Sequence, residues 1–332
     1  RLAVEEINRA GGVEAGQRRL KAVLVVEDNR GNPDQAVDVA RKLIHKDEVA
    51  ALIGPSISSN AIPAAKVAEQ AGVPMISPMS TNPATTLGKR FVFRVAFIDS
   101  FQGQVMARFA REDLGARRAA VLFDVANAYN KGIAEIFKQV FEEAGGKVVA
   151  FETYTTDDNQ DFSRQLERIG RARPEVLFLP NYEKDVLLQA RQARQLGLEA
   201  TLLGSDGWSL VLFAGLPEFA GSFYSTHWHP QAANQQAKAF IKKFKEAYDR
   251  APTAMEATAY DALGLLFAAV KNQGRADPES IRQGLVSQGR YQGVTGAIEY
   301  VDSGDPVKSA VIVKFTKEKA VFYRLVEPRE GP

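Results

Sequence analysis

The sequence predicts an α/β fold with two doubly wound, Rossmann-like lobes joined by a hinge of three crossovers. Its 332 residues exceed the usual size of a single domain. Short apolar runs alternate with amphipathic helical patterns, and this alternation restarts after Asp99. The apolar runs are continuous, as in parallel strands covered on both faces. Helical patterns follow one another closely near the C-terminus, so neither lobe is expected to be one uninterrupted segment.

The elements of the first lobe are bounded by turn residues. Leu2, Ala3 and Ile7 form the apolar stripe of an opening helix, which Gly11 and Gly12 end. Because a helix at the start of an α/β domain usually follows a strand, we expect a first strand and a signal sequence upstream of Arg1. The elements expected next are strand 20–27, helix 33–45, strand 49–53, helix 61–71, strand 73–77 and strand 91–95.

The second lobe is expected to continue the same alternation. Glycine pairs or single glycines stand where the C-caps of several of its helices belong. Lys317, Glu318 and Lys319 separate the last two apolar runs and indicate a hairpin. The expected elements are helix 101–114, strand 119–123, helix 129–144, strand 147–152, helix 162–171, strand 176–179, helix 183–196, strands 201–203 and 222–226, helices 235–248, 255–271 and 278–286, and strands 309–315 and 320–325.

Composition excludes several classes of function. With 42 basic and 40 acidic residues the net charge is +2, and no basic run carries interleaved aromatic residues, so no nucleic-acid partner is expected. No apolar run approaches the ~18 residues of a membrane span. The absence of cysteine excludes disulfides and thiolate metal sites. Neither a Walker A motif nor G-x-G-x-x-G occurs, so no nucleotide cofactor is expected.

Two hydroxyl-rich loops follow neighbouring strands in the run 53–83. Ser58 and Ser59 lie in the first loop, and Ser80 and Thr81 lie in the second. Loops at the carboxyl ends of strands converge on the crevice of an open α/β sheet, so these loops predict a site for a small polar ligand. The free N–H groups of the following helix would favour a carboxylate or phosphate there. Simple N-capping is the alternative for each serine taken alone.

Three residues of the second lobe follow its strands in the same way. Tyr129, Tyr182 and Asp206 lie just past strand ends or at helix starts. Each has an ordinary alternative role, as a rim aromatic residue or a solvated turn. Together they offer a carboxylate and aromatic walls, which suit an ammonium group.

Catalytic and metal-site interpretations are weak. The segment from Gly54 to Ser58 resembles the nucleophile elbow G-x-S-x-G, with Asp206 and His227 following in the order of a hydrolase. Its fifth residue is serine, however, where the tight turn needs glycine. His227 and His229 are spaced to share one face of a strand, but no third ligand is near them, so no metal is expected. We expect binding rather than catalysis.

The chain resembles a known family. It is similar to the periplasmic binding proteins of branched-chain amino acid ABC transporters, which have the type I periplasmic binding protein fold. The resemblance spans essentially the whole chain, in many motifs of fixed order. They are LAVEEINRAGG, IGPSISSN, MISPMSTNP, FRVAFIDSFQG, AYNKG, DFSRQL, LLQARQARQLG, LLGSDGW, AYDALGLL, GVTGAIEY and DPVKSAVIVKF.

The resemblance implies roles for the residues singled out above. Ser58 and Thr81 would hold the α-carboxylate of an amino acid, and the carbonyl of Ser80 would help to hold the α-ammonium. Asp206 would pair with that ammonium, in a position where the family often has the longer glutamate. The tyrosines at 129 and 182 would line the second lobe.

Two departures affect the side-chain pocket. Met79 stands where a smaller residue is common, and the segment that normally precedes the opening helix is not in the sequence. The pocket walls are expected to depend on Met79, Tyr129 and Trp208.

The resemblance also implies the organisation and biology of the protein. Residues 1–98 and 228–307 would form the carboxylate-binding lobe, and 99–227 and 308–332 the ammonium-pairing lobe. The protein would be extracytoplasmic, with or without a lipid anchor, and would deliver its amino acid transiently to a membrane ABC permease. The alternatives are an amide, urea or aromatic-acid ligand, and a ligand-sensing regulator of the same fold.

Overall fold

The chain divides into two compact units. The computed structural model describes residues 1–155, 161–232, 234–301 and 303–328. Unit 1 comprises Arg1–Ile98 and Ala233–Ser309, and unit 2 comprises Asp99–Ala232 and Ala310–Pro332, so the chain passes between the units three times. Residues 228–232 therefore group with unit 2 and 308–309 with unit 1, unlike in the expected boundaries.

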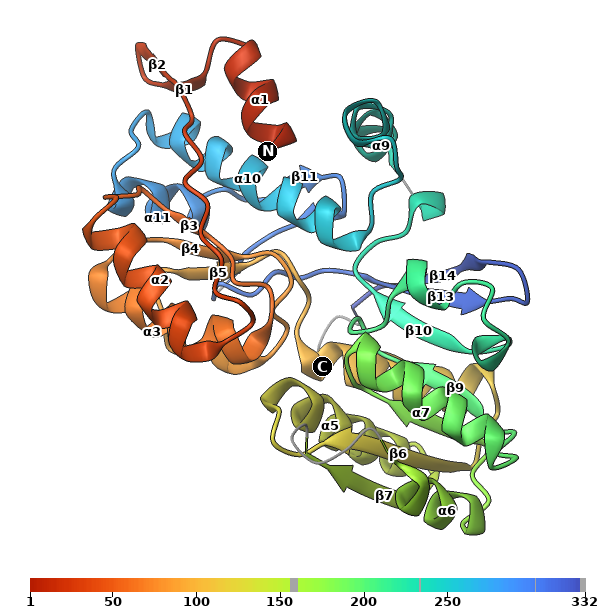
Figure 1. Cartoon of the computed structure of the whole chain (residues 1–332). Helices are drawn as coiled ribbons and strands as arrows, with labels where there is room; N and C mark the ends of the chain where they lie inside the picture. Colours follow the sequence, from red (N-terminus) through yellow and green to blue (C-terminus); the bar gives the residue numbers. More distant parts are fainter. Residues whose placement is uncertain (156–160, 233, 302, 329–332) are drawn as a thin grey trace. The chain divides into compact units, whose positions relative to one another are not determined.

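Unit 1 is built on a parallel sheet in the order β3-β4-β5. Figure 1 shows helices α2 and α3 on one side of this sheet and α10 and α11 on the other. Leu52 of β3 packs in the apolar cluster of α2 and α3, whereas its neighbour Ile53 packs toward that of α10 and α11. The bounds are α2 Pro33–His45, β3 Leu52–Ile53, α3 Ser58–Ala71, β4 Met75–Ser77, β5 Val92–Arg94, α9 Gln235–Tyr248, α10 Ala254–Gln273 and α11 Pro278–Val286.

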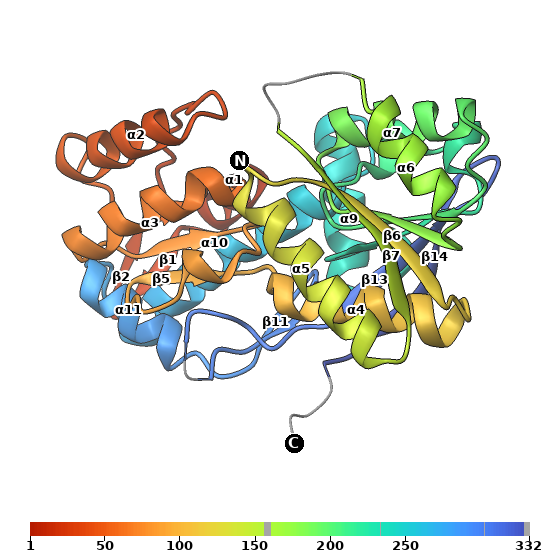
Figure 2. The ribbon, with the colours of Figure 1, turned by 90° about the horizontal axis from the view of Figure 1, so that it is seen from below.

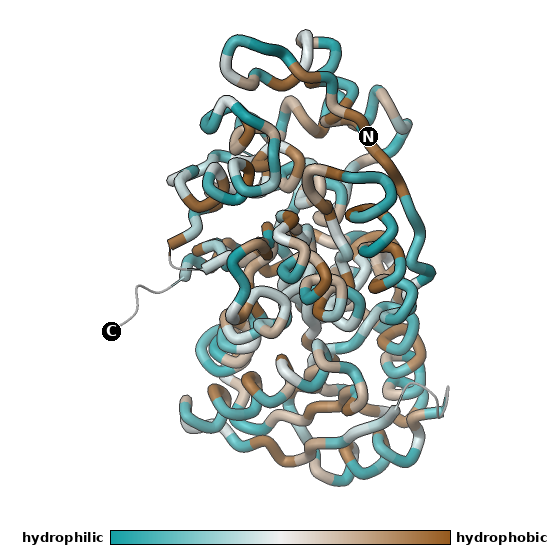
Figure 3. The backbone as a smooth tube through the Cα atoms, turned by 90° about the vertical axis from the view of Figure 1, so that its left-hand side faces the viewer, coloured by the Kyte–Doolittle hydropathy of each residue, from teal (hydrophilic) through white to brown (hydrophobic). Residues whose placement is uncertain are grey.

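The expectation of a strand over 20–27 is wrong. Helix α1 (Leu2–Arg9) is followed by a small hairpin of β1 (Val13–Ala15) and β2 (Arg18–Leu20), and the chain then runs irregularly to α2. A strand needs a neighbour for its ladder, and β3 pairs only with β4 among the described residues. The apolar residues Val23–Val26 are consequently exposed, with Val23 at 78% and Val26 at 63%. They belong to the brown stretches of Figure 3.

A second hairpin of unit 1 was also not expected. Strands β11 (Tyr291–Gly293) and β12 (Gly296–Ile298) pair antiparallel. The carboxylate of Asp261, in α10, accepts hydrogen bonds from the N–H groups of Val294 and Thr295 at the turn. This contact joins residues more than 30 positions apart, so no local sequence pattern predicts it.

Unit 2 is built on one seven-stranded mixed sheet in the order β14-β13-β10-β9-β8-β6-β7. The five strands from β10 to β7 run parallel, and β13 and β14 form the expected antiparallel hairpin at one edge. The strands are β6 Arg118–Asp124, β7 Lys147–Tyr154, β8 Val176–Leu179, β9 Thr201–Gly204, β10 Phe223–Thr226, β13 Ala310–Phe315 and β14 Ala320–Val326.

Helices cover both faces of this sheet, as in a doubly wound fold. Figure 2 shows α6 and α7 on one side and α4 and α5 on the other. On the second face the ring centroid of Phe137, from α5, lies 4.3 Å from that of Phe178, from β8. The helices are α4 Asp99–Arg108, which continues as a π-helical turn Phe109–Asp113, α5 Ala128–Glu143, α6 Ser163–Arg171, α7 Glu183–Gln195 and α8 Leu210–Phe213. Among the described residues, no helix has the length and apolar character that crossing a membrane requires.

Candidate functional site

The two hydroxyl-rich loops lie side by side in unit 1. β3 and β4 are parallel neighbours, so the loops that follow them emerge at the same edge of the sheet. The Ser58 hydroxyl lies 3.0 Å from that of Ser80, which lies 2.7 Å from Thr85 Oγ1. The N–H of Asn82 donates to Ser58 Oγ at 3.4 Å. We call Ser58, Ser80 and Thr85 the hydroxyl cluster.

The alternative that Ser58 or Ser59 is simply the N-cap of a helix is wrong. The N-cap of α3 is Ile57, which has no capping side chain, and Ser58 is already the first residue of the helix. No acidic residue lies in the first turn of α3. The partial positive charge of the helix N-terminus is therefore not offset by an acidic side chain of its own first turn.

The other predicted residues of unit 1 differ in exposure. Thr81 is buried at 1% exposure, whereas Ser59 and Met79 are half-buried. For the Thr81 hydroxyl, no hydrogen bond occurs within the described ranges. Thr81 thus keeps a free hydroxyl directly beside the hydroxyl cluster.

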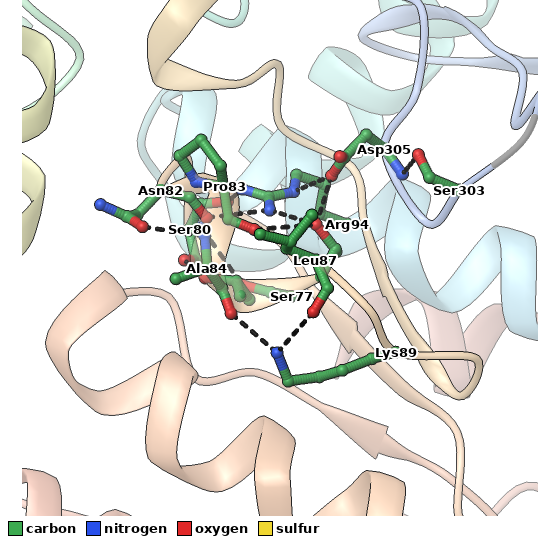
Figure 4. A network of polar contacts seen from close by, with 12 residues as sticks. Ser77, Ser80, Asn82, Pro83, Ala84, Leu87, Lys89, Arg94, Ser303 and Asp305 are labelled. Atoms are coloured by element: carbon green, nitrogen blue, oxygen red, sulfur yellow. Dashed lines mark hydrogen bonds and ion pairs between the residues drawn. The ribbon is translucent and has the colours of Figure 1, made fainter.

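A buried arginine organises the second loop, and sequence reasoning missed it. Arg94, at the end of β5, is fully buried. Its guanidinium donates to the carbonyl oxygens of Ser80 at 2.7 Å and of Asn82 at 2.9 Å, and its Nε lies 2.7 Å from Asp305 (Figure 4). A charged residue inside an apolar strand run was the available signal.

The Arg94 contact bears on the predicted role of Ser80. The carbonyl oxygen of Ser80 has two lone pairs, of which the guanidinium occupies one. A ligand ammonium at the remaining lone pair would lie close to a buried cation. This geometry favours an anionic group over a cationic one beside Ser80.

The predicted residues Tyr129 and Asp206 meet in unit 2. The Tyr129 hydroxyl lies 2.7 Å from Asp206 Oδ1 and 2.6 Å from Ser205 Oγ, and it accepts from the N–H of Gly207 at 3.1 Å. A phenol has one proton and an ionised carboxylate only accepts, so Tyr129 donates to Asp206 and accepts from Ser205. The hydroxyl is therefore saturated, and Tyr129 offers a ligand only its ring.

His227 is the second partner of Asp206. His227, directly after β10, places Nε2 3.1 Å from Asp206 Oδ2, and its side chain is fully buried. The side chain of Asp206 is 7% exposed. We call Asp206, Tyr129, Ser205 and His227 the acidic cluster. Sequence reasoning considered His227 only as part of a triad or a metal site.

The tyrosines are held neutral beside this charge. Burial, followed by the charges of Asp206 and Asp99, raises the pKa of Tyr129 well above its ordinary value, and the same causes raise the pKa of Tyr182. The Tyr182 ring stacks on that of Tyr129 with 5.2 Å between centroids. Asp99, buried at the start of α4, is thus a second carboxylate near the acidic cluster, which the sequence reasoning did not identify.

The expectation that Trp208 lines the pocket is wrong. Its Nε1–H donates to the carbonyl of Leu179, and its ring packs among Phe213, Phe219 and Tyr224 at 4% exposure. A Cβ on Gly204 would meet the Trp208 ring at 2.1 Å, so the glycine of the GSDGW motif makes room for this core packing.

Neither the hydrolase nor the metal interpretation gains support. In a serine triad the Nε2 of histidine takes the serine proton, but here Nε2 faces Asp206. His229 accepts from the N–H of Gln231 through Nδ1. Within the described ranges no group of three His, Cys, Asp or Glu could hold a metal ion.

Comparison with known proteins agrees with the fold. A protein-family model described as periplasmic binding protein matches residues 1–319. The chain is 32% identical over 310 residues to the leucine-, isoleucine-, valine-, threonine- and alanine-binding protein of Pseudomonas aeruginosa, covering 92% of this chain and 80% of that protein.

Two solved structures are similar over nearly the whole chain. The leucine-binding protein LivK of Thermotoga maritima superposes with a TM-score of 0.91 at 34% identity, covering 98% of this chain and 93% of the other. The branched-chain amino acid transporter substrate-binding protein LivJ of Streptococcus pneumoniae, in complex with isoleucine, gives 0.90 at 28% identity, covering 98% and 92%. The chain belongs to the periplasmic binding protein family and has its type I fold.

Proposed function

We propose that this protein is an extracytoplasmic solute-binding protein that captures a branched-chain or related amino acid and delivers it to an ABC permease. The acidic cluster carries the proposal. Asp206 keeps a nearly buried carboxylate whose two oxygens each have one protein partner, leaving lone pairs for an ammonium group. Two relatives named above support the ligand class: one is a leucine-, isoleucine-, valine-, threonine- and alanine-binding protein, and the other was solved in complex with isoleucine.

The α-carboxylate is assigned to unit 1. Ser58, Ser59 and Thr81 are its proposed hydroxyl partners, together with the N-terminus of α3. The buried Arg94 behind the carbonyl of Ser80 adds a favourable field for an anion there. The proposed wall for the ligand's side chain consists of Met79, Tyr182 and the ring of Tyr129.

We further propose that one ligand engages both units. Burying a zwitterion costs several kcal/mol per charge unless each charge is paired and hydrogen-bonded. A ligand that bonds both units only in a closed state would shift a hinge equilibrium toward closure. Small-angle scattering with and without leucine tests this: the radius of gyration should fall, and an unchanged value with leucine bound would contradict closure.

A ligand screen tests the proposed function. Amino acids, amides, urea and benzoate are each added in a thermal-unfolding assay, because a ligand at a hundredfold excess over its Kd stabilises the folded state by about 2.7 kcal/mol. Leucine, isoleucine or valine should raise the Tm of the native chain and leave that of Asp206→Ala unchanged. A response to benzoate or urea alone would favour the alternative ligand classes, and no response to any amino acid would contradict the proposal.

A further inference from the structure

Asp305 holds the guanidinium of Arg94 through a single oxygen atom. Figure 4 shows Asp305 facing this guanidinium: Oδ1 of Asp305 lies 2.7 Å from Nε of Arg94. The same Oδ1 accepts a hydrogen bond from the Thr86 hydroxyl at 2.6 Å, and that hydroxyl accepts from Arg94 Nη2 at 2.6 Å. Because a hydroxyl has one proton to donate, the direction of these bonds is fixed. Asp305 and Thr86 together therefore set the orientation of the guanidinium.

The segment that carries Asp305 is fixed to strand β5. The backbone N–H of Arg94 donates to the carbonyl of Gly304 at 2.9 Å, and the Tyr300 hydroxyl donates to the carbonyl of Arg94 at 2.9 Å. A Cβ on Gly304 would meet the carbonyl oxygen of Val92 at 1.9 Å, so only glycine permits this close approach. Asp305 is thus presented to Arg94 from a backbone with a defined position.

Arg94 transmits this position to Thr81. Its guanidinium binds the carbonyl oxygens on both sides of Thr81, at Ser80 and at Asn82. The peptide between Ser80 and Thr81 is trans, so its N–H points away from the carbonyl that Arg94 holds. Within the described ranges this N–H donates no hydrogen bond. The direction in which Thr81 offers its N–H and hydroxyl is therefore set by a residue that does not itself face the ligand.

We propose that Asp305 is a positioning residue for the carboxylate site: its Oδ1 orients Arg94, and Arg94 orients Thr81. The proposal rests on the proposed function, because that function assigns Thr81 to the ligand's carboxylate. It gives Asp305 two separable roles. The charge of Asp305 balances the buried Arg94 and acts on stability, whereas its Oδ1 fixes the geometry of the loop and acts on affinity.

Two variants of Asp305 separate these roles. Asp305→Asn removes the charge, but its amide oxygen can take the place of Oδ1; Asp305→Ala removes both. Both variants should lower the urea midpoint, because Arg94 loses its countercharge. Leucine affinity, measured by calorimetry, should stay close to native in Asp305→Asn. In Asp305→Ala it should fall about tenfold or more, the loss that corresponds to one hydrogen bond to a charged group.

A third variant tests the same link with both charges in place. Thr86→Val keeps the size of a side chain that is 2% exposed and removes only the hydroxyl between Arg94 and Asp305. Leucine affinity should fall in this variant, by less than in Asp305→Ala. Asp277→Ala is the control, because Asp277 caps α11 in the same unit and has no contact with the loop. It should lower the urea midpoint and leave leucine affinity unchanged.

A double-mutant cycle shows whether the effect passes through Thr81. Thr81→Val removes the hydroxyl that the loop presents to the ligand. If Asp305 acts by placing Thr81, the loss of leucine affinity caused by Asp305→Ala should be smaller in the Thr81→Val background than in the native one. Additive losses would overturn the proposed route from Asp305 to the ligand.

The outcomes distinguish this inference from the proposed function. Native leucine affinity in Asp305→Ala or in Thr86→Val would overturn the positioning role and leave the proposed function intact. Equal losses of affinity in Asp305→Asn and Asp305→Ala would also overturn it, because affinity would then follow the charge rather than the oxygen. Absence of leucine binding by the native chain would overturn the proposed function itself.

Discussion

The Arg94 site beside the hydroxyl cluster of unit 1 and the acidic cluster of unit 2 treat a buried charge in opposite ways. In unit 1 the buried cation Arg94 is already satisfied, by Asp305 and by two backbone carbonyls. In unit 2 the carboxylate of Asp206 has only neutral partners when His227 is unprotonated. The comparison shows that the first charge is satisfied within the fold, whereas the carboxylate of Asp206 keeps lone pairs that its protein partners do not use.

Removal of the structural charge should have the largest effect. In Arg94→Met, Asp305 and the carbonyls of Ser80 and Asn82 lose their donor, and breaking a buried ion pair costs about 3–5 kcal/mol. The urea midpoint, followed by circular dichroism, should fall accordingly. Arg9→Met, which alters a side chain that is 72% exposed, should leave the midpoint nearly unchanged. Equal midpoints for the two variants would contradict a structural role for Arg94.

Removal of the available charge should act on binding instead. Asp206→Ala should weaken leucine binding by about 2–5 kcal/mol, the usual cost of unpairing a buried charge. Calorimetry measures the affinity, and a urea titration of the same variant shows whether folding is retained. Native affinity in this variant would place the ammonium group elsewhere.

A second buried pair of unit 1 makes stability depend on pH. Lys308 is near Asp261, and burial lowers the pKa of Lys308 to about 8 in the folded protein, from an ordinary value of 10.5. Between these values the unfolded chain binds a proton that the folded chain does not, so this residue makes stability rise with pH, by up to about 1.4 kcal/mol per unit. Below about pH 7 both states are protonated, and its contribution is flat.

Unfolding midpoints at pH 7, 8 and 9 measure this contribution as the difference between the native chain and Lys308→Met. The difference should grow in favour of the native chain from pH 8 to 9 and change much less from 7 to 8. A constant difference over the whole range would mean that Lys308 keeps an ordinary pKa.

The smallest effect is expected within the hydroxyl cluster. Ser58→Ala removes one proposed partner of the ligand carboxylate and should cost roughly 1 kcal/mol of leucine affinity. Thr85→Ala is the matched control, because Thr85 bonds Ser80 and has no proposed contact with the ligand. Equal losses in the two variants would indicate that the cluster acts only through its internal hydrogen bonds.

Much of the fold could be predicted because its strands and helices are locally specified. Helix α2 begins at Pro33, where Asn32 caps it, and β8 and α11 have the expected bounds. The segment 20–27 shows the limit of this reasoning. Its apolar run has the composition of a strand, but strand formation depends on a partner that the pattern of one segment cannot supply.

The types of residue in the candidate site could be predicted from the sequence, but the contacts between them could not. Tyr129 and Asp206 both follow the ends of strands, which indicated a shared location, and the two side chains do contact each other. Trp208 was expected to shape the pocket wall, yet its ring packs into the core. His227 and Arg94 were missed because their roles depend on residues distant in the sequence.

The exposed segment Val23–Val26 has a consequence for the behaviour of the protein in solution. Four consecutive apolar side chains beside a backbone outside any sheet ladder are a template for pairing with other chains. Arg18, Arg19 and Lys21 precede the run and Glu27 and Asp28 follow it, the arrangement of charged gatekeepers that opposes aggregation. Concentrated samples should therefore be most prone to self-association at high salt, which screens these charges.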